Sequence, residues 1–219
     1  LFESDGFHLG AHHQLSHNVT PAMASVREYS YGDSLRHIHW PSTALTSKFM
    51  VKEFESELRN EVWLVLDMHQ DVQVGPEINN TEETSVSIAV SIMNKFFNMG
   101  ISVGLVAQGD QYHILSPQDS PAAHEELMST LAVIRAEGKT PLSALLAQAQ
   151  PLLTSISNLV IITPSSDVSW VHRLGTFLGR GGQIAVVLVD AQSFGAPRSL
   201  GQARNLLQGR NTLYYVVRQ

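Results

Sequence analysis

The stretch Glu61-Val62-Trp63-Leu64-Val65-Leu66-Asp67 decides the fold, because five consecutive apolar residues end on a carboxylate. A short run that is apolar at every position is typical of a strand buried on both faces. Similar runs follow along the chain, and we expect further strands at 101–107, 112–115, 159–163, 184–189 and 213–217. Most of these strands should be central in a sheet.

Segments of helical period separate most of these runs. The first begins near Thr81, has Glu82 and Glu83 in its first turn, and stops at Gly100. Others are expected at about 121–136, 141–153, 169–180 and 197–208. Alternating strands and helices predict an α/β fold with a mostly parallel sheet. The short link at 108–110 predicts a hairpin, which makes one edge strand antiparallel.

Composition narrows the functional classes. The 219 residues are 43% hydrophobic and carry a net charge of −6, with 14 basic residues scattered along the chain. Nucleic acid is therefore not an expected partner, since its binding needs clustered positive charge. There is no cysteine, which excludes disulfides, thiolate catalysis and cysteine-based zinc sites. No apolar run is long enough to span a bilayer.

Residues 1–60 differ from the rest and are expected to form an N-terminal β appendage, with strands at 25–30 and 49–55; residues 61–219 should form the α/β domain. The sequence begins with Leu1 instead of methionine and shows no signal-peptide pattern there, so we expect it to be a piece of a longer protein. Four histidines near this end have a spacing that would allow a metal site on a helix, although a flexible polar terminus is the preferred interpretation: His8, His12, His13 and His17.

The appendage contains one dense motif, which runs from Val26 to Trp40. Gly32 before Asp33 suits a tight turn, in which Asp33 accepts bonds from turn amides or pairs with an arginine. Ile38 and Trp40 are expected to alternate onto one face and anchor the segment. The motif is interpreted as a structural buttress, with partner binding as the alternative, and its signature residues are Arg27, Tyr29, Gly32, Asp33, Arg36 and Trp40.

This motif resembles the signature R-x-Y-x-x-G-D-x-x-R-x-I-x-W of the domain of unknown function 58 family. The resemblance is close over residues 26–67 and architectural beyond them. It implies a three-layer, Rossmann-like von Willebrand factor type A fold in a bacterial or archaeal protein that carries N-terminal transmembrane helices. It also implies work beside a MoxR-type AAA+ ATPase, in assembly or chaperoning rather than catalysis. Pro41 and Leu45 depart from the family pattern.

Type A domains hold a divalent cation at the carboxyl end of the central strand, in a D-x-S-x-S loop completed by a threonine and a second aspartate. Here Asp67 and Thr140 match that pattern, whereas His69 and Asp71 stand where the two serines belong. Pro164 replaces the distal aspartate, with Asp167 just beyond. We therefore expect a degenerate metal-ion-dependent adhesion site. Coordination through His69, Asp71 or Asp167 stays open, with Mg²⁺ or a transition metal as the ion.

Catalysis has one weak candidate, because Gly32-Asp33-Ser34-Leu35 spells the GDSL string of an esterase family. That chemistry needs an apolar strand before the serine and a C-terminal D-x-x-H, whereas Asp110 to His113 lies in mid-chain. The expected function is a non-catalytic protein-interaction module without a required cofactor, working with a MoxR-type AAA+ ATPase at the cytoplasmic face of the cell membrane. A metal-dependent ligand-binding domain is the alternative, and the esterase a remote one.

Overall fold

The structure is a computed structural model. It describes residues 23–29, 38–54, 61–76, 79–118, 120–153, 158–178, 183–197, 199–210 and 212–218. The chain divides into two compact units, residues 1–58 and 59–219, and each is described by itself. Within the described ranges, no helix combines the length and the apolar character that crossing a membrane requires.

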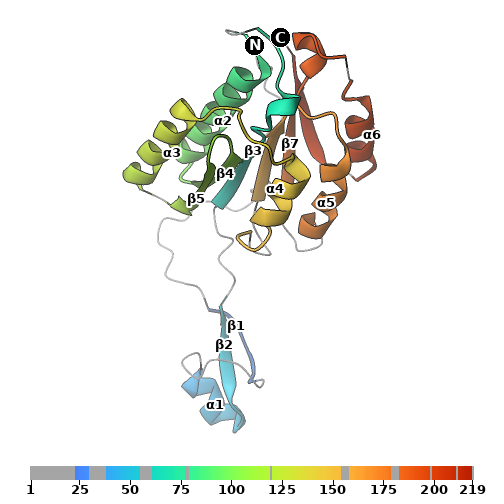
Figure 1. The fold of residues 1–219 in the computed structure, drawn as a ribbon. Helices are drawn as coiled ribbons and strands as arrows, with labels where there is room; N and C mark the ends of the chain where they lie inside the picture. Colours follow the sequence, from blue (N-terminus) through green and yellow to red (C-terminus); the bar gives the residue numbers. More distant parts are fainter. Residues whose placement is uncertain are drawn as a thin grey trace. The chain divides into compact units, whose positions relative to one another are not determined.

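The larger unit is built on a six-stranded sheet with the order β5-β4-β3-β6-β7-β8 (Figure 1). All neighbours are parallel except β4 and β5, which form the expected antiparallel hairpin at one edge. The predicted α/β class with one antiparallel edge strand is therefore confirmed. The strands are β3 (Glu61–Leu66), β4 (Ser102–Gln108), β5 (Tyr112–Gln118), β6 (Asn158–Thr163), β7 (Ile184–Val189) and β8 (Leu213–Val217).

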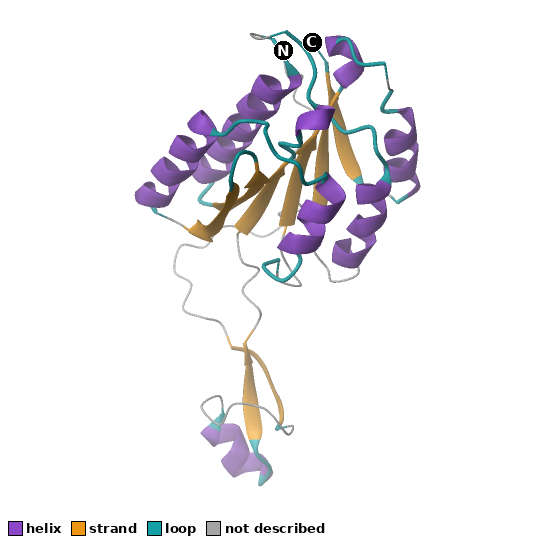
Figure 2. Cartoon of the chain, in the orientation of Figure 1, coloured by secondary structure: helices purple, strands orange, loops and turns teal. Residues whose placement is uncertain are grey.

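Helices cover both faces of this sheet, which gives three layers (Figure 2). On one face lie α2 (Thr81–Asn98) and α3 (Pro121–Val133); on the other lie α4 (Leu142–Ala149), α5 (Ser169–Leu178) and α6 (Gly201–Gly209). The central strand β3 is buried from Val62 to Leu66, as its unbroken apolar run predicts. Each such buried side chain stabilises the fold by about 2 kcal/mol relative to its exposed form.

Several boundaries differ from the sequence predictions. The helix expected at 197–208 is α6, which begins at Gly201. A separate 3₁₀ turn at Ala191–Phe194 precedes it and ends at Gly195, which has a positive φ of 101°. Helices α3 and α4 end at Val133 and Ala149, before the expected 136 and 153. Strand β5 continues to Gln118, beyond the expected 115, through a bulge against β4. Gly104 permits that bulge, since a Cβ there would lie 2.8 Å from Cδ of Pro117.

The N-terminal unit contains an antiparallel pair, β1 (Met23–Glu28) and β2 (Met50–Phe54), and a short helix, α1 (Trp40–Thr46). Ile38 is buried and bridges to Val51 of β2. The expectation that Ile38 and Trp40 share one anchoring face is wrong, because the chain turns into α1 at Trp40, where Pro41 occupies the first turn. Trp40 is exposed there.

Candidate functional site

The candidate site is the crest at the carboxyl end of β3, where Asp67 follows the strand directly. Because β3 has β4 on one side and β6 on the other, the chain leaves this point in opposite directions. Open α/β sheets bind ligands at such a switch point. Unlike most carboxylates, Asp67 is buried.

Both carboxylate oxygens of Asp67 accept hydrogen bonds from the protein. The hydroxyl of Thr163 donates to Oδ2 at 2.6 Å, and the backbone N–H of His69 donates to Oδ1 at 3.2 Å. Thr163 is held in turn, because its oxygen accepts from the N–H of Ser165 at 2.9 Å. Burial raises the pKa of Asp67, and the bonds from Thr163 and His69, together with the charge on His69, lower it in part.

Thr163 was missed in the sequence analysis, which looked for an aspartate one position later. The pairing register of β3 and β6 identifies Thr163 as the neighbour of Asp67. Leu66 of β3 pairs with Ile162 of β6, and the N–H of Asp67 donates to the carbonyl of Ile162 at 3.0 Å. The residue after Ile162 therefore lies next to Asp67.

Gln73 is a second residue that the sequence analysis did not identify. Its Nε2 donates to the carbonyl of Asp67 at 2.9 Å, and its Oε1 accepts from the hydroxyl of Thr81 at 2.8 Å. Thr81 also accepts from the N–H of Val74 at 2.9 Å. Gln73 thus connects the loop that carries Asp67 to the first turn of α2.

The loop that carries Thr140 enters the crest through Gly138. The N–H of Gly138 donates to the carbonyl of Met68 at 3.1 Å, and its carbonyl accepts from the N–H of Gln70 at 2.9 Å. A Cβ at Gly138 would lie 2.0 Å from the carbonyl oxygen of Gln108, so only glycine fits between the ends of β3 and β4. Thr140, two residues later, is half-buried.

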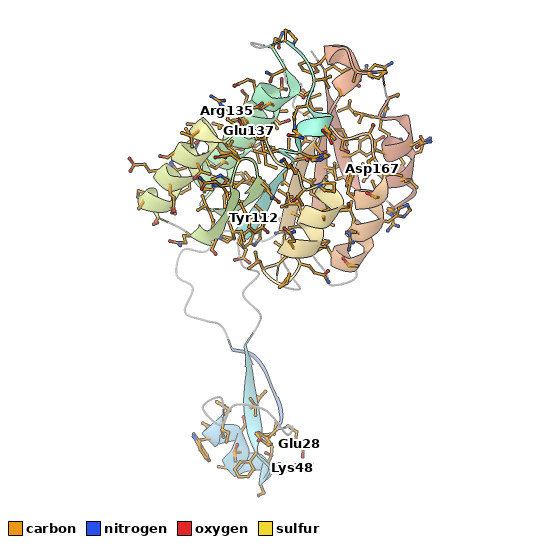
Figure 3. All side chains as sticks on the ribbon, in the orientation of Figure 1. Glu28, Lys48, Tyr112, Arg135, Glu137 and Asp167 are labelled. Carbon is orange, nitrogen blue, oxygen red and sulfur yellow. The ribbon has the colours of Figure 1, made fainter. Side chains whose placement is uncertain are left out.

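The substitute ligands proposed from the sequence have other contacts. Nε2 of His69 lies 3.7 Å from Oδ2 of Asp71, which is exposed. Asp167 (Figure 3) accepts from the N–H of Ser169 at 3.2 Å and from the Ser169 hydroxyl, at the start of α5. The bond from the Ser169 side chain lowers the pKa of Asp167, and its slight burial opposes this.

These residues fit a conventional Mg²⁺ site poorly. A hard cation needs several oxygen ligands. Throughout the described ranges, no three side chains of histidine, cysteine, aspartate or glutamate gather around one point. Each oxygen of Asp67 accepts one hydrogen bond and keeps a second lone pair, so Asp67 offers one ligand group and the other ligands would have to be hydroxyls or water.

A cleft of about 690 Å³ opens beside Asp167. It is lined by the loop after β6 and the start of α6, through Ser166, Asp167, Val168, Ser199, Gly201, Gln202 and Asn205. Five of these seven described residues are polar, and Asp167 is the acidic one. The cleft lies beyond the carboxyl ends of β6 and β7, not at the central switch point.

The appendage signature is described only in part. Gly32, Asp33, Arg36 and the GDSL serine Ser34 lie outside the described residues, as do the four N-terminal histidines. Arg27 pairs through its backbone with Val51. Tyr29 donates its N–H to the carbonyl of Phe49 at 2.8 Å, and their rings meet edge to face at 6.4 Å.

The structure also describes the D-x-x-H motif of the esterase alternative, Asp110 to His113. Nε2 of His113 lies 3.9 Å from Oδ1 of Asp110, at the tip of the β4–β5 hairpin. That distance is longer than a hydrogen bond. The pair belongs to a hairpin, as the sequence predicted.

Comparisons with known proteins agree with this architecture. The model of the family described as "Protein of unknown function DUF58" matches residues 25–204. The uncharacterized protein YeaD of Bacillus subtilis (strain 168) is 24% identical over 187 residues, which cover 84% of this chain and 43% of that protein. The chain thus spans less than half the length of this relative.

Solved structures support the fold alone, because their sequence identity is low. The conserved hypothetical protein BatB from Bacteroides thetaiotaomicron superposes with a TM-score of 0.54 at 12% identity, covering 73% of this chain and 90% of that chain. The pilus adhesin SpaC from Lactobacillus rhamnosus GG gives a TM-score of 0.56 at 12% identity, covering 72% of this chain and 28% of that chain.

Proposed function

The chain belongs to the DUF58 family of proteins of unknown function, and from that premise we propose that it is a non-catalytic protein-interaction module. Its larger unit has the layered arrangement that the resemblance to type A domains implies. Its N-terminal unit carries the family signature and presents the binding surface.

One observation carries this proposal: the N-terminal unit exposes large apolar side chains within ten residues. Trp40 is 64% exposed, Leu45 87% and Phe49 57%, and α1 buries none of its residues. Among the residues of this unit whose exposure is described, the buried apolar side chains are Ile38 and Val51. Clustered exposed apolar side chains mark interaction sites.

The partner class that we propose is a MoxR-type AAA+ ATPase, in keeping with the family resemblance, and the location is the cytoplasmic face of a membrane. The test is an affinity measurement between this chain and the purified MoxR-type ATPase of the same genome. Trp40→Ala and Leu45→Ala should each weaken binding about tenfold, which equals 1.4 kcal/mol.

Val133→Ala is the matched control, because Val133 is a similarly exposed apolar residue on α3 of the larger unit. Binding should be unchanged in this variant. If wild-type chain and ATPase do not bind, or if all three variants bind equally well, this interaction surface is excluded.

A metal-dependent ligand-binding domain is the second candidate. The observation that favours it is that the Asp67 carboxylate and the Thr163 hydroxyl lie within 2.6 Å of each other at the switch point, because hard cations prefer oxygen ligands. Calorimetric titration with Mg²⁺, Mn²⁺ and Zn²⁺ separates the two candidates. Micromolar binding that Asp67→Ala abolishes, together with loss of partner binding in EDTA, would replace the interaction module by this second function.

The non-catalytic part of the proposal has its own test. Hydrolysis of p-nitrophenyl acetate should be the same for wild type and Ser34→Ala, at the background rate. Turnover that depends on Ser34 would restore the esterase.

A further inference from the structure

The outer edge of β5 is open in the part of the chain that the structure describes, since β4 is its neighbour on one side only. An edge strand presents unpaired N–H and C=O groups, and proteins usually protect it with charged residues. The seven residues of β5 include no aspartate, glutamate, lysine or arginine. Pro117 lies near the end of the strand, which leaves Tyr112 to Ser116 available for pairing.

One face of this edge is apolar. Ile114 pairs with Val106, which belongs to the core beneath α4, α5 and α6. Tyr112 pairs with Gln108 and lies on the same face, because side chains two apart share a face. Tyr112 (Figure 3) and Ile114 are both partly exposed, because β5 is the last strand of the sheet.

A groove of about 240 Å³ lies between the outer edge of β5 and α3. Its described lining consists of Ile114, Leu115, Ser116 and Gln118 on the strand and Ala123, Glu126 and Leu127 on the helix. Glu126 is the charged residue of this lining. A groove between a strand edge and a helix accepts alternate side chains of an added strand.

We propose that β5 is a strand-addition site, at which a partner segment pairs in extended conformation and alternates apolar with basic side chains. The apolar side chains cover Tyr112 and Ile114, and the basic ones enter the groove toward Glu126. Main-chain hydrogen bonds supply affinity, and the position of Glu126 relative to Tyr112 and Ile114 supplies register.

Charge decides between a partner and a second copy of this chain. A second copy pairing through its own β5 would bring no basic residue to the groove and would bring a second Glu126. The net charge of −6 adds to that repulsion. A partner segment with apolar and basic side chains matches Tyr112, Ile114 and Glu126 without this repulsion.

The other outer strand, β8, provides the comparison. It also lacks charged residues but has five residues instead of seven, and Leu213 is 49% exposed where Ile114 is 38% exposed. Substitution of Leu213 in β8 therefore serves as the control for substitution of Ile114 in β5. The β5 site consists of residues of the larger unit and shares none with the proposed N-terminal surface. It therefore goes beyond the proposed function, and its test does not depend on that function.

The experiment uses this chain and a fluorescein-labelled heptapeptide of alternating valine and lysine, followed by fluorescence anisotropy. Saturable binding is expected, and Ile114→Lys should weaken it about tenfold or more, because a charged residue blocks pairing at an edge. Glu126→Gln should weaken it about threefold, as expected for one exposed ion pair. Glu125→Gln and Leu213→Lys are the matched controls and should leave it unchanged.

Circular dichroism establishes that each variant is folded. If Ile114→Lys unfolds, Tyr112→Lys on the same face of β5 replaces it and should weaken binding to the same extent. A peptide of alternating valine and glutamate should bind more weakly than the lysine peptide. The proposal is overturned by absence of saturable binding, by equal binding of the two peptides, or by a loss that follows Leu213→Lys. It is also overturned if sedimentation shows a dimer that Ile114→Lys dissociates, because the edge then pairs with a second copy.

Discussion

The crest of the larger unit and the N-terminal unit differ in how far the side chains of their candidate functional residues are bonded within the chain. At the crest, polar side chains bond to one another, as Asp67 does with Thr163 and Gln73 with Thr81. In the N-terminal unit, apolar side chains such as Leu45 are exposed. The first region is satisfied by its own atoms, whereas the second gains most from a surface supplied by another molecule.

This difference bears on where to look for function in this α/β fold. At the switch point, the described bonds connect Asp67 to Thr163 and His69. The family signature, in contrast, lies in the N-terminal unit, whose described helix α1 buries none of its residues. Stability should therefore be sensitive at the crest and tolerant at α1.

The largest loss of stability is expected for substitution of Gly138. In Gly138→Ala the new Cβ meets the carbonyls of Gln108 and Met68, and the free energy of unfolding should fall by about 3 kcal/mol. Urea denaturation measures this loss. Gly209→Ala is the control, because nothing lies within 4 Å of its added Cβ, and it should leave stability nearly unchanged. Equal stability of the two variants would mean that the crest is not closely packed.

The second largest loss of stability is expected for substitution of Thr163. Thr163→Val keeps the shape of the side chain but leaves Asp67 without its shorter hydrogen bond, at a cost of about 2 kcal/mol. Thr176→Val on α5 is the control, since Thr176 is exposed and bonds only within its own helix. A loss below that of Thr176→Val would show that Asp67 does not depend on Thr163.

Asp67 predicts a pH dependence of definite sign. Its pKa in the folded state lies above the ordinary value of 3.8, so its contribution to stability is fully present below 3.8 and is lost as pH rises through the folded pKa. The difference in free energy of unfolding between wild type and Asp67→Asn should therefore decrease with increasing pH. A difference that increases would show that the bonds to the carboxylate outweigh its burial.

Asp167 predicts the opposite sign and a smaller effect. Its pKa is lowered, so its contribution is present above 3.8 and disappears as pH falls through the lowered value. Asp167→Ala should cost about 1 kcal/mol near neutral pH, because Ser169 at the start of α5 loses its two hydrogen bonds to the carboxylate. The cost should vanish in acid, and a cost that persists there would assign the effect to packing.

The smallest effect on stability is expected at Leu45. Leu45→Ser removes an apolar side chain that is almost fully exposed, so the free energy of unfolding should change by less than about 0.5 kcal/mol. Differential scanning calorimetry measures this change, with Leu64→Ala in the buried centre of β3 as the contrast at about 3 kcal/mol. A large loss at Leu45 would mean that α1 packs within the chain, which would remove the difference between the two regions.

Much of the fold was predictable because its elements carry local signals. The run from Val62 to Leu66, the helix start at Thr81 and the short link before Tyr112 each predict an element without reference to the rest of the chain, and the strand alternation predicts a parallel sheet. Helix α1 was not predicted, because a seven-residue helix with proline in its first turn has almost no periodicity to detect.

The candidate site was predictable only in its first residue. The sequence by itself determined that Asp67 ends a strand buried on both faces, because an unbroken apolar run predicts such a strand. The same pattern recurs at Asp190 after β7, so it does not by itself locate the site. Only the tertiary structure decided what the carboxylate of Asp67 does. Its partners Thr163 and His69 lie on different segments, and strand register, a property of pairing between segments distant along the chain, brings Thr163 within 2.6 Å.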